Sequence, residues 1–126
     1  MNVVKHEAMN EKEKINVQLL FSPQEYAELE RNAKLRKLPV PLYIKCAVLP
    51  GNGFYPYWQQ LLHMVEGLPA GTRFNIKALF GVSWTMDRGI KLNLGKTFYN
   101  QVKAGTIADV APDGKDSSEV MWYKRL

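Results

Sequence analysis

The sequence has few of the residues and patterns that mark secreted, membrane or metal-binding proteins. A single cysteine, Cys46, excludes a disulfide within the chain, and its place in an apolar segment predicts a buried structural thiol. The two histidines, His6 and His63, have no ligand partners at metal-site spacing. No apolar run approaches the length of a membrane span, and the polar first residues do not resemble a secretory signal. We therefore expect a cytoplasmic protein with no metal, no cofactor and no membrane contact.

Catalytic patterns are missing as well. The sequence contains no glycine-rich phosphate loop, no metal-ligand cluster and no serine–histidine pairing. Tyr99 and Tyr123 have no general base that would make either of them a nucleophile. We therefore expect a protein that is not an enzyme and has no small-molecule substrate.

The composition is that of a folded, basic protein. Hydrophobic residues make up 46% and aromatic residues 11% of the 126 residues, which excludes general disorder. Lys and Arg outnumber Asp and Glu by 17 to 12, and the net charge of +5 with a pI near 9.4 is typical of nucleic-acid binders. Many basic proteins bind no nucleic acid, so charge alone leaves both possibilities open.

Breaks in the sequence pattern divide the chain into four expected parts. Residues 1–13 have no stable period and are expected to form a flexible arm. A first module covers 14–49, a linker with the turn-rich Pro50–Gly53 covers 50–55, and a second module covers 56–126. The predicted fold class is α+β.

The first module opens with an alternating strand. Ile15, Val17, Leu19 and Phe21 share one face of residues 14–21, and Lys14, Asn16, Gln18 and Leu20 share the other. A lone strand needs a partner, and no second strand lies nearby in the sequence. We therefore expect the partner strand to come from a second copy, in a homodimer through residues 14–49.

Two helices are predicted after this strand. Ser22 and Pro23 are a capping residue and a first-turn proline, which predicts a helix over 23–37 with Tyr26, Leu29 and Ala33 facing inward. After a break at Leu38-Pro39, a second helix is expected over 40–49. Its predicted inward residues are Val40, Tyr43, Ile44, Ala47 and Val48.

This module resembles the ribbon-helix-helix family. The resemblance rests on residues 16–26, then on Leu29, Ala33, Val40 and Tyr43-Ile44. It implies an intertwined dimer whose paired strands enter the major groove of double-stranded DNA. It also implies that Asn16, Gln18 and Leu20 read the bases, a role that suits amides because each carries a donor and an acceptor.

The second helix departs from the family pattern. That family usually begins this helix with Ser or Thr and holds a phosphate on the free N–H groups. Here Pro39 and Pro41 remove two donors, which weakens the expectation of a phosphate contact. A first module that only dimerises is the alternative.

The second module is predicted to have the element order of a winged helix. Helices are expected from Pro56 to Gly67, over 76–80 with Asn75 as cap, and over 94–104 with Asn93 as cap. Leu94, Phe98 and Val102 should face inward. The other expected elements are an extended piece near 72–74, a loop over 81–89 with Trp84 in the core, and a hairpin with strands 106–111 and 120–124 around a turn at 112–115.

The third of these helices is the expected recognition element. Its predicted outward residues are Lys96, Thr97, Asn100, Gln101 and Lys103. Arg88 and Lys91 precede them, and no acidic residue lies between Arg88 and Ala108. Lys115 adds a basic residue in the wing, although the acidic residues there should approach phosphates poorly. These acidic residues of the predicted wing are Asp113, Asp116 and Glu119. For the basic helix as a whole, the alternative interpretation is a solvated helix face with no binding role.

Residues 66–125 also resemble a small, uncharacterised bacterial family with winged-helix-like organisation. The resemblance rests on residues 68–74, Leu79-Phe80, Trp84, 94–98, Val102, Gly105 and 114–118. It implies a fold and no biochemistry.

The expected function is that of a dimeric, sequence-specific DNA-binding protein. The leading interpretation is a bacterial transcriptional regulator or repressor, and a plasmid or phage is one possible source of it. An accessory DNA-processing protein in plasmid transfer or partition is an alternative. A non-enzymatic protein-binding adaptor or inhibitor is another, and salt-dependent binding to random DNA distinguishes it from a DNA binder.

Overall fold

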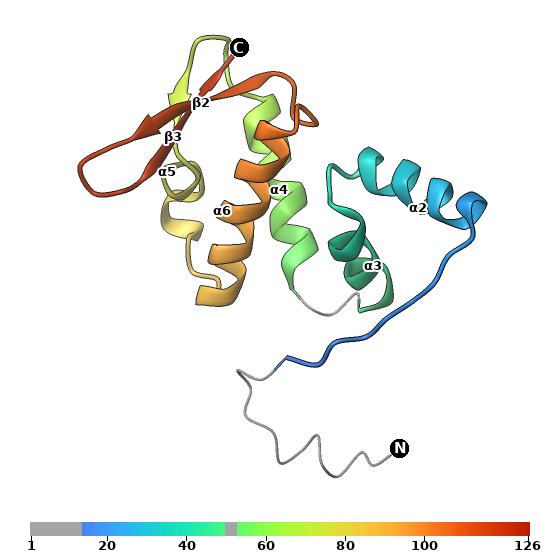
Figure 1. Cartoon of the computed structure of the whole chain (residues 1–126). Helices are drawn as coiled ribbons and strands as arrows, with labels where there is room; N and C mark the ends of the chain where they lie inside the picture. The colour runs from blue at the N-terminus through green and yellow to red at the C-terminus, as the bar shows by residue number, and fades with distance from the viewer. Residues whose placement is uncertain (1–13, 50–52) are drawn as a thin grey trace.

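A computed structural model describes residues 14–49 and 53–126 of the chain (Figure 1). The expected arm over 1–13 and residues 50–52 of the expected linker lie outside these residues. The predicted α+β class is confirmed at the level of a mixed chain with a small antiparallel sheet. In order, the elements are α2 (Pro23–Leu35), α3 (Val40–Val48), α4 (Phe54–Glu66), β1 (Arg73–Phe74), α5 (Ile76–Phe80), the 3-10 turn η1 (Gly81–Ser83), α6 (Arg88–Lys103), β2 (Val110–Lys115) and β3 (Met121–Arg125).

The sheet has three antiparallel strands in the order β1-β3-β2. Phe74 of β1 pairs with Tyr123 of β3, and their rings stack with centroids 5.7 Å apart. Phe98 of α6 meets both rings edge-on, at 6.2 Å from Phe74 and 4.8 Å from Tyr123. These contacts fix α6 against one face of the sheet.

The core lies between α4, α6 and the sheet. Its largest fully buried side chains are Trp58, Leu61, Leu94, Phe98 and Tyr123. Leu38 and Cys46, from the first predicted module, belong to the same hydrophobic cluster. The expected burial of Cys46 is therefore confirmed, and the two predicted modules share one core.

Trp58 joins α2 and α3 to the rest of the molecule. Its indole N–H donates a hydrogen bond to the carbonyl of Arg36, 2.9 Å away, at the end of α2. The last carbonyls of a helix have no partner within the helix, so a side-chain donor satisfies this one. The guanidinium of Arg36 lies 5.2 Å from the ring centre of Tyr43 and 5.4 Å from that of Tyr55. The hydrogen bond of Trp58 and the contact of Arg36 with Tyr55 therefore connect the two halves of the chain.

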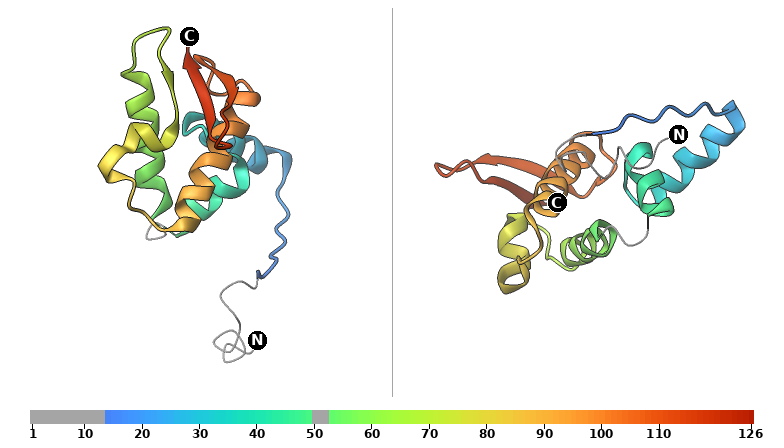
Figure 2. Two further views of the ribbon diagram at one scale, coloured as in Figure 1. Left: turned by 90° about the vertical axis from the view of Figure 1, so that its left-hand side faces the viewer. Right: turned by 90° about the horizontal axis from the view of Figure 1, so that it is seen from below.

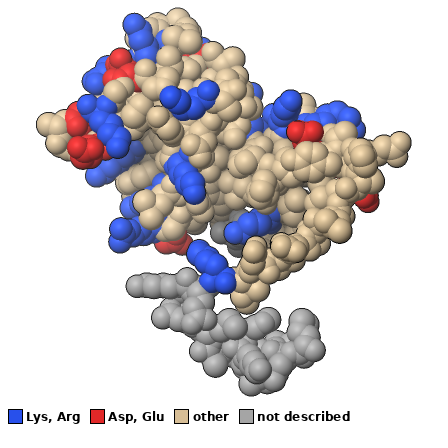
Figure 3. Space-filling model, in the orientation of Figure 1, with Lys and Arg blue, Asp and Glu red and all other residues tan. Residues whose placement is uncertain are grey.

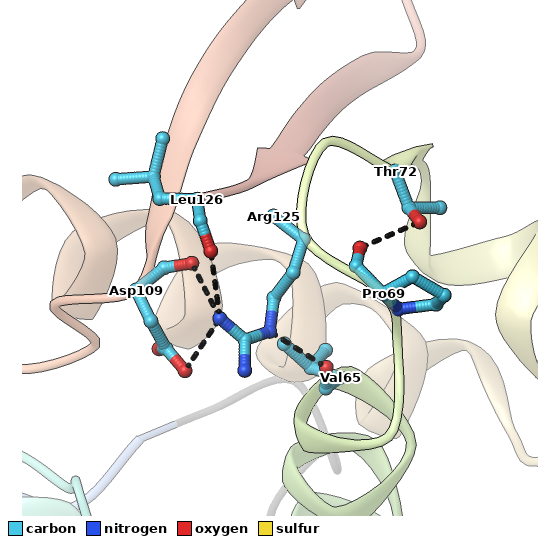
Figure 4. A network of polar contacts seen from close by, with 6 residues as sticks. All are labelled: Val65, Pro69, Thr72, Asp109, Arg125 and Leu126. Atoms are coloured by element: carbon cyan, nitrogen blue, oxygen red, sulfur yellow. Dashed lines mark hydrogen bonds and ion pairs between the residues drawn. The ribbon is translucent and has the colours of Figure 1, made fainter.

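Arg125 holds the C-terminal end against α4 and the start of β2 (Figure 4). Its Nε donates to the carbonyl of Val65 at 3.2 Å, and its Nη1 lies 3.1 Å from a carboxylate oxygen of Asp109. The backbone N–H of Arg125 donates to the carbonyl of Thr72 at 2.8 Å. With its side chain and its backbone, Arg125 therefore links β3 to α4, to the segment before β1 and to the segment before β2.

The first helix has its predicted cap, but in both of the first two helices the buried side chains differ from the prediction. Ser22 forms the predicted cap as a complete capping box with Glu25. Ala33 is buried, whereas Tyr26 is exposed, contrary to its predicted inward position. In α3, Cys46 faces the core, whereas Ala47 and Val48 are exposed. Within one chain the inward prediction for Ala47 and Val48 is therefore wrong, because the side of α3 that carries Cys46 is the one packed into the core.

Two helix starts in the second half differ from the prediction. α4 begins at Phe54, inside the predicted linker, and Pro56 lies in its first turn, where a missing N–H breaks no helical bond. α6 begins at Arg88, six residues before the predicted start. Its cap is Asp87, whose carboxylate accepts from the N–H of Ile90 at 3.0 Å, and Asn93 is an exposed residue within the helix. The predicted cap at Asn75 and the helix Ile76–Phe80 are confirmed.

The hairpin is shifted along the chain from its predicted position. Residues 104–109 form turns, so β2 starts at Val110, and the expected turn residues 112–115 belong to the strand. Pro112 is tolerated because β2 is an edge of the sheet. Asp116 makes the tip, since its carboxylate accepts from the N–H groups of Ser118 and Val120. A side-chain turn of this kind replaced the predicted Pro-Asp-Gly turn.

Acid should loosen this tip. The hydrogen bond from the Trp122 indole, followed by that from Val120, lowers the pKa of Asp116 below its ordinary value of 3.8. A lowered carboxyl pKa contributes stability above that value, and the contribution is lost as pH falls through the pKa in the folded chain. We expect the indole N–H resonance of Trp122 to move in an acid titration below pH 3.8, and that of Trp58, bonded to a neutral carbonyl, to move less. Equal shifts of the two indole resonances would contradict the coupling of Trp122 to the titration of Asp116.

Candidate nucleic-acid interface

The outward side of α6 carries a row of basic and apolar residues. From one residue of this row to the next, the sequence advances by four, four, three and four positions. This spacing places all five residues on one face of the helix, and all are exposed. Lys103 lies over the ring of Tyr99, with Nζ 5.9 Å from the ring centre. The helix contains no acidic residue, and its cap Asp87 is the nearest one in the sequence. We call these residues the α6 row: Arg88, Leu92, Lys96, Tyr99 and Lys103.

Two of the predicted contact residues do not belong to this face. Thr97 and Gln101 are buried, at 6% and 9% exposure, so the prediction that they point outward is wrong. They recur with Leu94, Phe98 and Val102 at the three- and four-residue spacing of a buried stripe. The same periodicity was available in the sequence and would have excluded them. Asn100 is exposed as predicted.

A hollow of about 510 Å³ lies beside this row, between α5, α6 and the hairpin. Lys91, Gly95, Lys96 and Tyr99 line it from α6, and Lys115 lines it from β2. The predicted residues Lys91, Lys96 and Lys115 are therefore brought together, whereas Arg88, Asn100 and Lys103 are not among its lining residues. We call it the α6–hairpin hollow; its other lining residues are Asn75, Ile76, Lys77, Trp84, Val120, Met121 and Tyr123.

Several lining residues were missed in the sequence. Trp84 is half-buried at the edge of the core, 5.4 Å from the ring of Phe80, and Lys91 lies over it at 5.5 Å. Burial, followed by the neighbouring Tyr99, raises the pKa of Tyr123 to about 12. Its phenol is therefore protonated at neutral pH and can donate a hydrogen bond. No local pattern joins α5, α6 and β3, so these residues could not be grouped from the sequence.

The acidic residues of the hairpin are engaged with neighbours. Asp113 pairs with Arg73 at 2.7 Å, and Glu119 lies 3.7 Å from Lys115. Asp116 accepts the hydrogen bond of Trp122 at 2.9 Å. Exposed pairs contribute little stability, but they lower the local negative charge. The objection that an acidic wing approaches phosphates poorly is thereby weakened. Figure 3 shows several Lys and Arg side chains over the α5, α6 and hairpin half of the molecule.

The predicted base readers lie in a separate place. Asn16, Gln18 and Leu20 belong to the extended segment 14–22, which pairs with no strand among the described residues. The segment and the hairpin lie at opposite sides of the molecule in Figure 1 and in the right-hand view of Figure 2. All three side chains are exposed, with Leu20 at 99%, and the alternate residues Ile15, Val17 and Leu19 are exposed as well.

The start of α3 has few free donors. Pro39 is its N-cap without a side-chain hydrogen bond, and Pro41 lies in its first turn. Both prolines also face α6, because they line a second, smaller hollow with Thr97 and Gln101. Two prolines without backbone N–H groups leave few donors for a phosphate at this helix start, in agreement with the expectation from the sequence.

Within the described residues, no cluster of three or more His, Cys, Asp or Glu side chains could hold a metal ion. His63 is exposed on α4. No helix in the described ranges is both long and apolar enough to cross a membrane.

Comparison with known proteins gives a match in the second half of the chain. A family model described as a domain of unknown function, DUF1413, matches residues 59–125. No ribbon-helix-helix or winged-helix family model matches. No curated protein and no solved structure is significantly similar to the chain. Because the family match covers just over half of the chain, the protein belongs to the DUF1413 family.

Proposed function

We propose that this protein is a homodimeric, sequence-specific DNA-binding protein that acts as a transcriptional regulator. The observation that carries the proposal is the α6 row, an exposed helix face with three cations and no acidic residue. Phosphate oxygens are bound by Lys and Arg, and Asn100, exposed on the same helix, offers an amide to a base edge.

The second half has features that support a winged-helix mode of binding. Three helices, α4, α5 and α6, are interleaved with a sheet of order β1-β3-β2, and the β2–β3 hairpin lies next to the last helix. In this proposal α6 enters the major groove and the hairpin lies along the neighbouring backbone. Lys115 then supplies a phosphate contact from the hairpin.

The first half supports dimerisation in the ribbon-helix-helix manner. Nine of the thirteen exposed large apolar side chains lie between Ile15 and Leu49, although this part is the smaller one. Such a concentration of exposed apolar residues marks a surface that another protein covers. A second copy would pair its segment 14–21 with this one and cover Leu35, Val48 and Leu49. The opposite face of the ribbon would then present Asn16, Gln18 and Leu20 to DNA.

Lys96→Ala combined with Lys103→Ala should weaken binding to all DNA sequences. Each lost phosphate contact removes about one counterion released on binding. The slope of log affinity against log salt concentration should therefore fall by about 2 per protomer. Fluorescence anisotropy with labelled DNA at several salt concentrations measures this slope.

A matched control removes two cations from α2, Arg31→Ala with Lys34→Ala, and should leave the slope unchanged. An unchanged slope in the α6 variant would remove α6 from the interface. A wild-type chain that binds no random DNA at low salt would instead favour a protein-binding adaptor. Selection of bound sequences from random DNA then tests specificity and the two-fold symmetry expected of a dimer site.

A further inference from the structure

The α6–hairpin hollow has the composition of a ligand site. We propose that it binds a small organic anion: a molecule with a flat apolar body and one carboxylate or phosphate group. Ligand sites are concave, mostly apolar and furnished with a few polar groups that fix orientation. A volume of about 510 Å³ is within the range of such sites.

The charges around the hollow select an anion. Lys77, Lys91 and Lys96 line it, and none of the three forms an ion pair with a described residue. No acidic side chain is among the lining residues. Lys115 is a fourth cation, already 3.7 Å from Glu119. A carboxylate or phosphate entering the hollow would therefore meet uncompensated positive charge.

The walls select an apolar, flat body. Trp84, Tyr99 and Met121 are partly exposed, and together with Ile76 they line the hollow with apolar surface. Aromatic faces favour stacking on another flat ring. Tyr123 and Asn75 add polar groups to the lining: the phenol stays protonated at neutral pH, and the Asn75 side chain uses its oxygen to accept from Ala78, which leaves its NH₂ as a donor.

Gly95 keeps the hollow open. Glycine within a helix is unfavourable relative to alanine, so its presence in the middle of α6 needs a reason. Packing does not provide one, because a Cβ built at Gly95 would meet no atom within 4 Å. The missing side chain leaves the α6 wall of the hollow unfilled.

The test uses the whole chain and 2-naphthoate as the probe, with 2-naphthamide as its neutral isostere, followed by amide chemical shifts. We expect saturable shifts confined to α5, α6 and the hairpin, with a dissociation constant on the order of 1 mM or tighter for a ligand of this size. The amide should bind about tenfold more weakly, since it lacks the charge that the lysines recognise. Equal binding of the two compounds would overturn the anion assignment.

Gly95→Leu tests the location without removing a charge. The leucine should fill the hollow and weaken naphthoate binding about tenfold or more, whereas Gly95→Ala, which adds one methyl group, should have a smaller effect. Lys91→Gln should weaken binding, and Lys34→Gln, on α2 and outside the lining, should not. Unchanged binding in Gly95→Leu, or shifts centred on residues 14–21, would overturn the proposal.

Failure of this inference is separable from failure of the proposed function. The titration contains no DNA, so a chain that binds naphthoate but no DNA would lose the regulator proposal and keep the ligand site. A chain that binds DNA and shows no saturable shifts with naphthoate would keep the regulator proposal and lose the ligand site.

Discussion

If the proposed homodimer forms, Val17→Asp combined with Leu19→Asp is expected to convert it to a monomer. Both residues lie on the apolar face of the segment 14–21, and both are more than half exposed in the single chain. In a paired ribbon this face would be buried against the helices of both copies. Placing two carboxylates there without partners costs at least ~3 kcal/mol, which weakens association about 100-fold or more. Analytical ultracentrifugation measures the change, and site-specific DNA binding should be lost with the dimer.

The opposite face of the same segment provides the matched control. Asn16→Ala with Gln18→Ala should leave the dimer intact and remove discrimination between the selected site and random DNA, because each amide pair with a base contributes about 1–3 kcal/mol. A wild-type monomer at micromolar concentration would remove the main support for the ribbon. Selectivity that survives in the alanine variant would place base reading elsewhere, with α6 as the next candidate.

Trp58→Ala should cost about 3–5 kcal/mol of unfolding free energy, the usual range for removing a large aromatic side chain from a core. Trp58 is fully buried, stacks on Phe54 at 5.9 Å and meets Phe98 edge-on at 6.4 Å. Because small domains are stable by about 5–15 kcal/mol, this change should remove a large share of the total. Urea denaturation followed by circular dichroism measures it.

Trp58→Phe separates packing from the hydrogen bond. Phenylalanine keeps an aromatic ring but cannot donate to the carbonyl of Arg36, so about 1–3 kcal/mol should be lost. The loss should be largest around α2 and α3, which amide hydrogen exchange can locate. A cost below about 1 kcal/mol for Trp58→Ala would mean that the two halves do not share the core described above.

Local signals were predicted well. Ser22, Asn75 and the inward series Leu94, Phe98 and Val102 have the predicted roles, and the helix Ile76–Phe80 has the predicted bounds. A capping side chain bonds an N–H two or three residues away, so the relevant residues are adjacent in the sequence. One error is also local: Asp87 and Asn93 are both good caps, and the helix begins after Asp87, so that Ile90 lies within it and packs against the core.

Long-range contacts decided the rest. The position of β3 depends on Arg125, which bonds residues 16 and 60 positions away. No periodicity in the sequence contains such a pairing, because it depends on how separate elements pack.

The sequence by itself determined the order of the helices, the caps at Ser22 and Asn75, the apolar alternation of residues 15–21 and the basic character of α6. Each of these depends on residues within a few positions of one another, where backbone geometry alone sets which side chains meet. Only the tertiary structure decided that the two halves share one core through Trp58, and that lysines from α5, α6 and β2 surround one hollow. The physical reason is that burial and charge clustering arise between elements, after the chain has brought distant residues together.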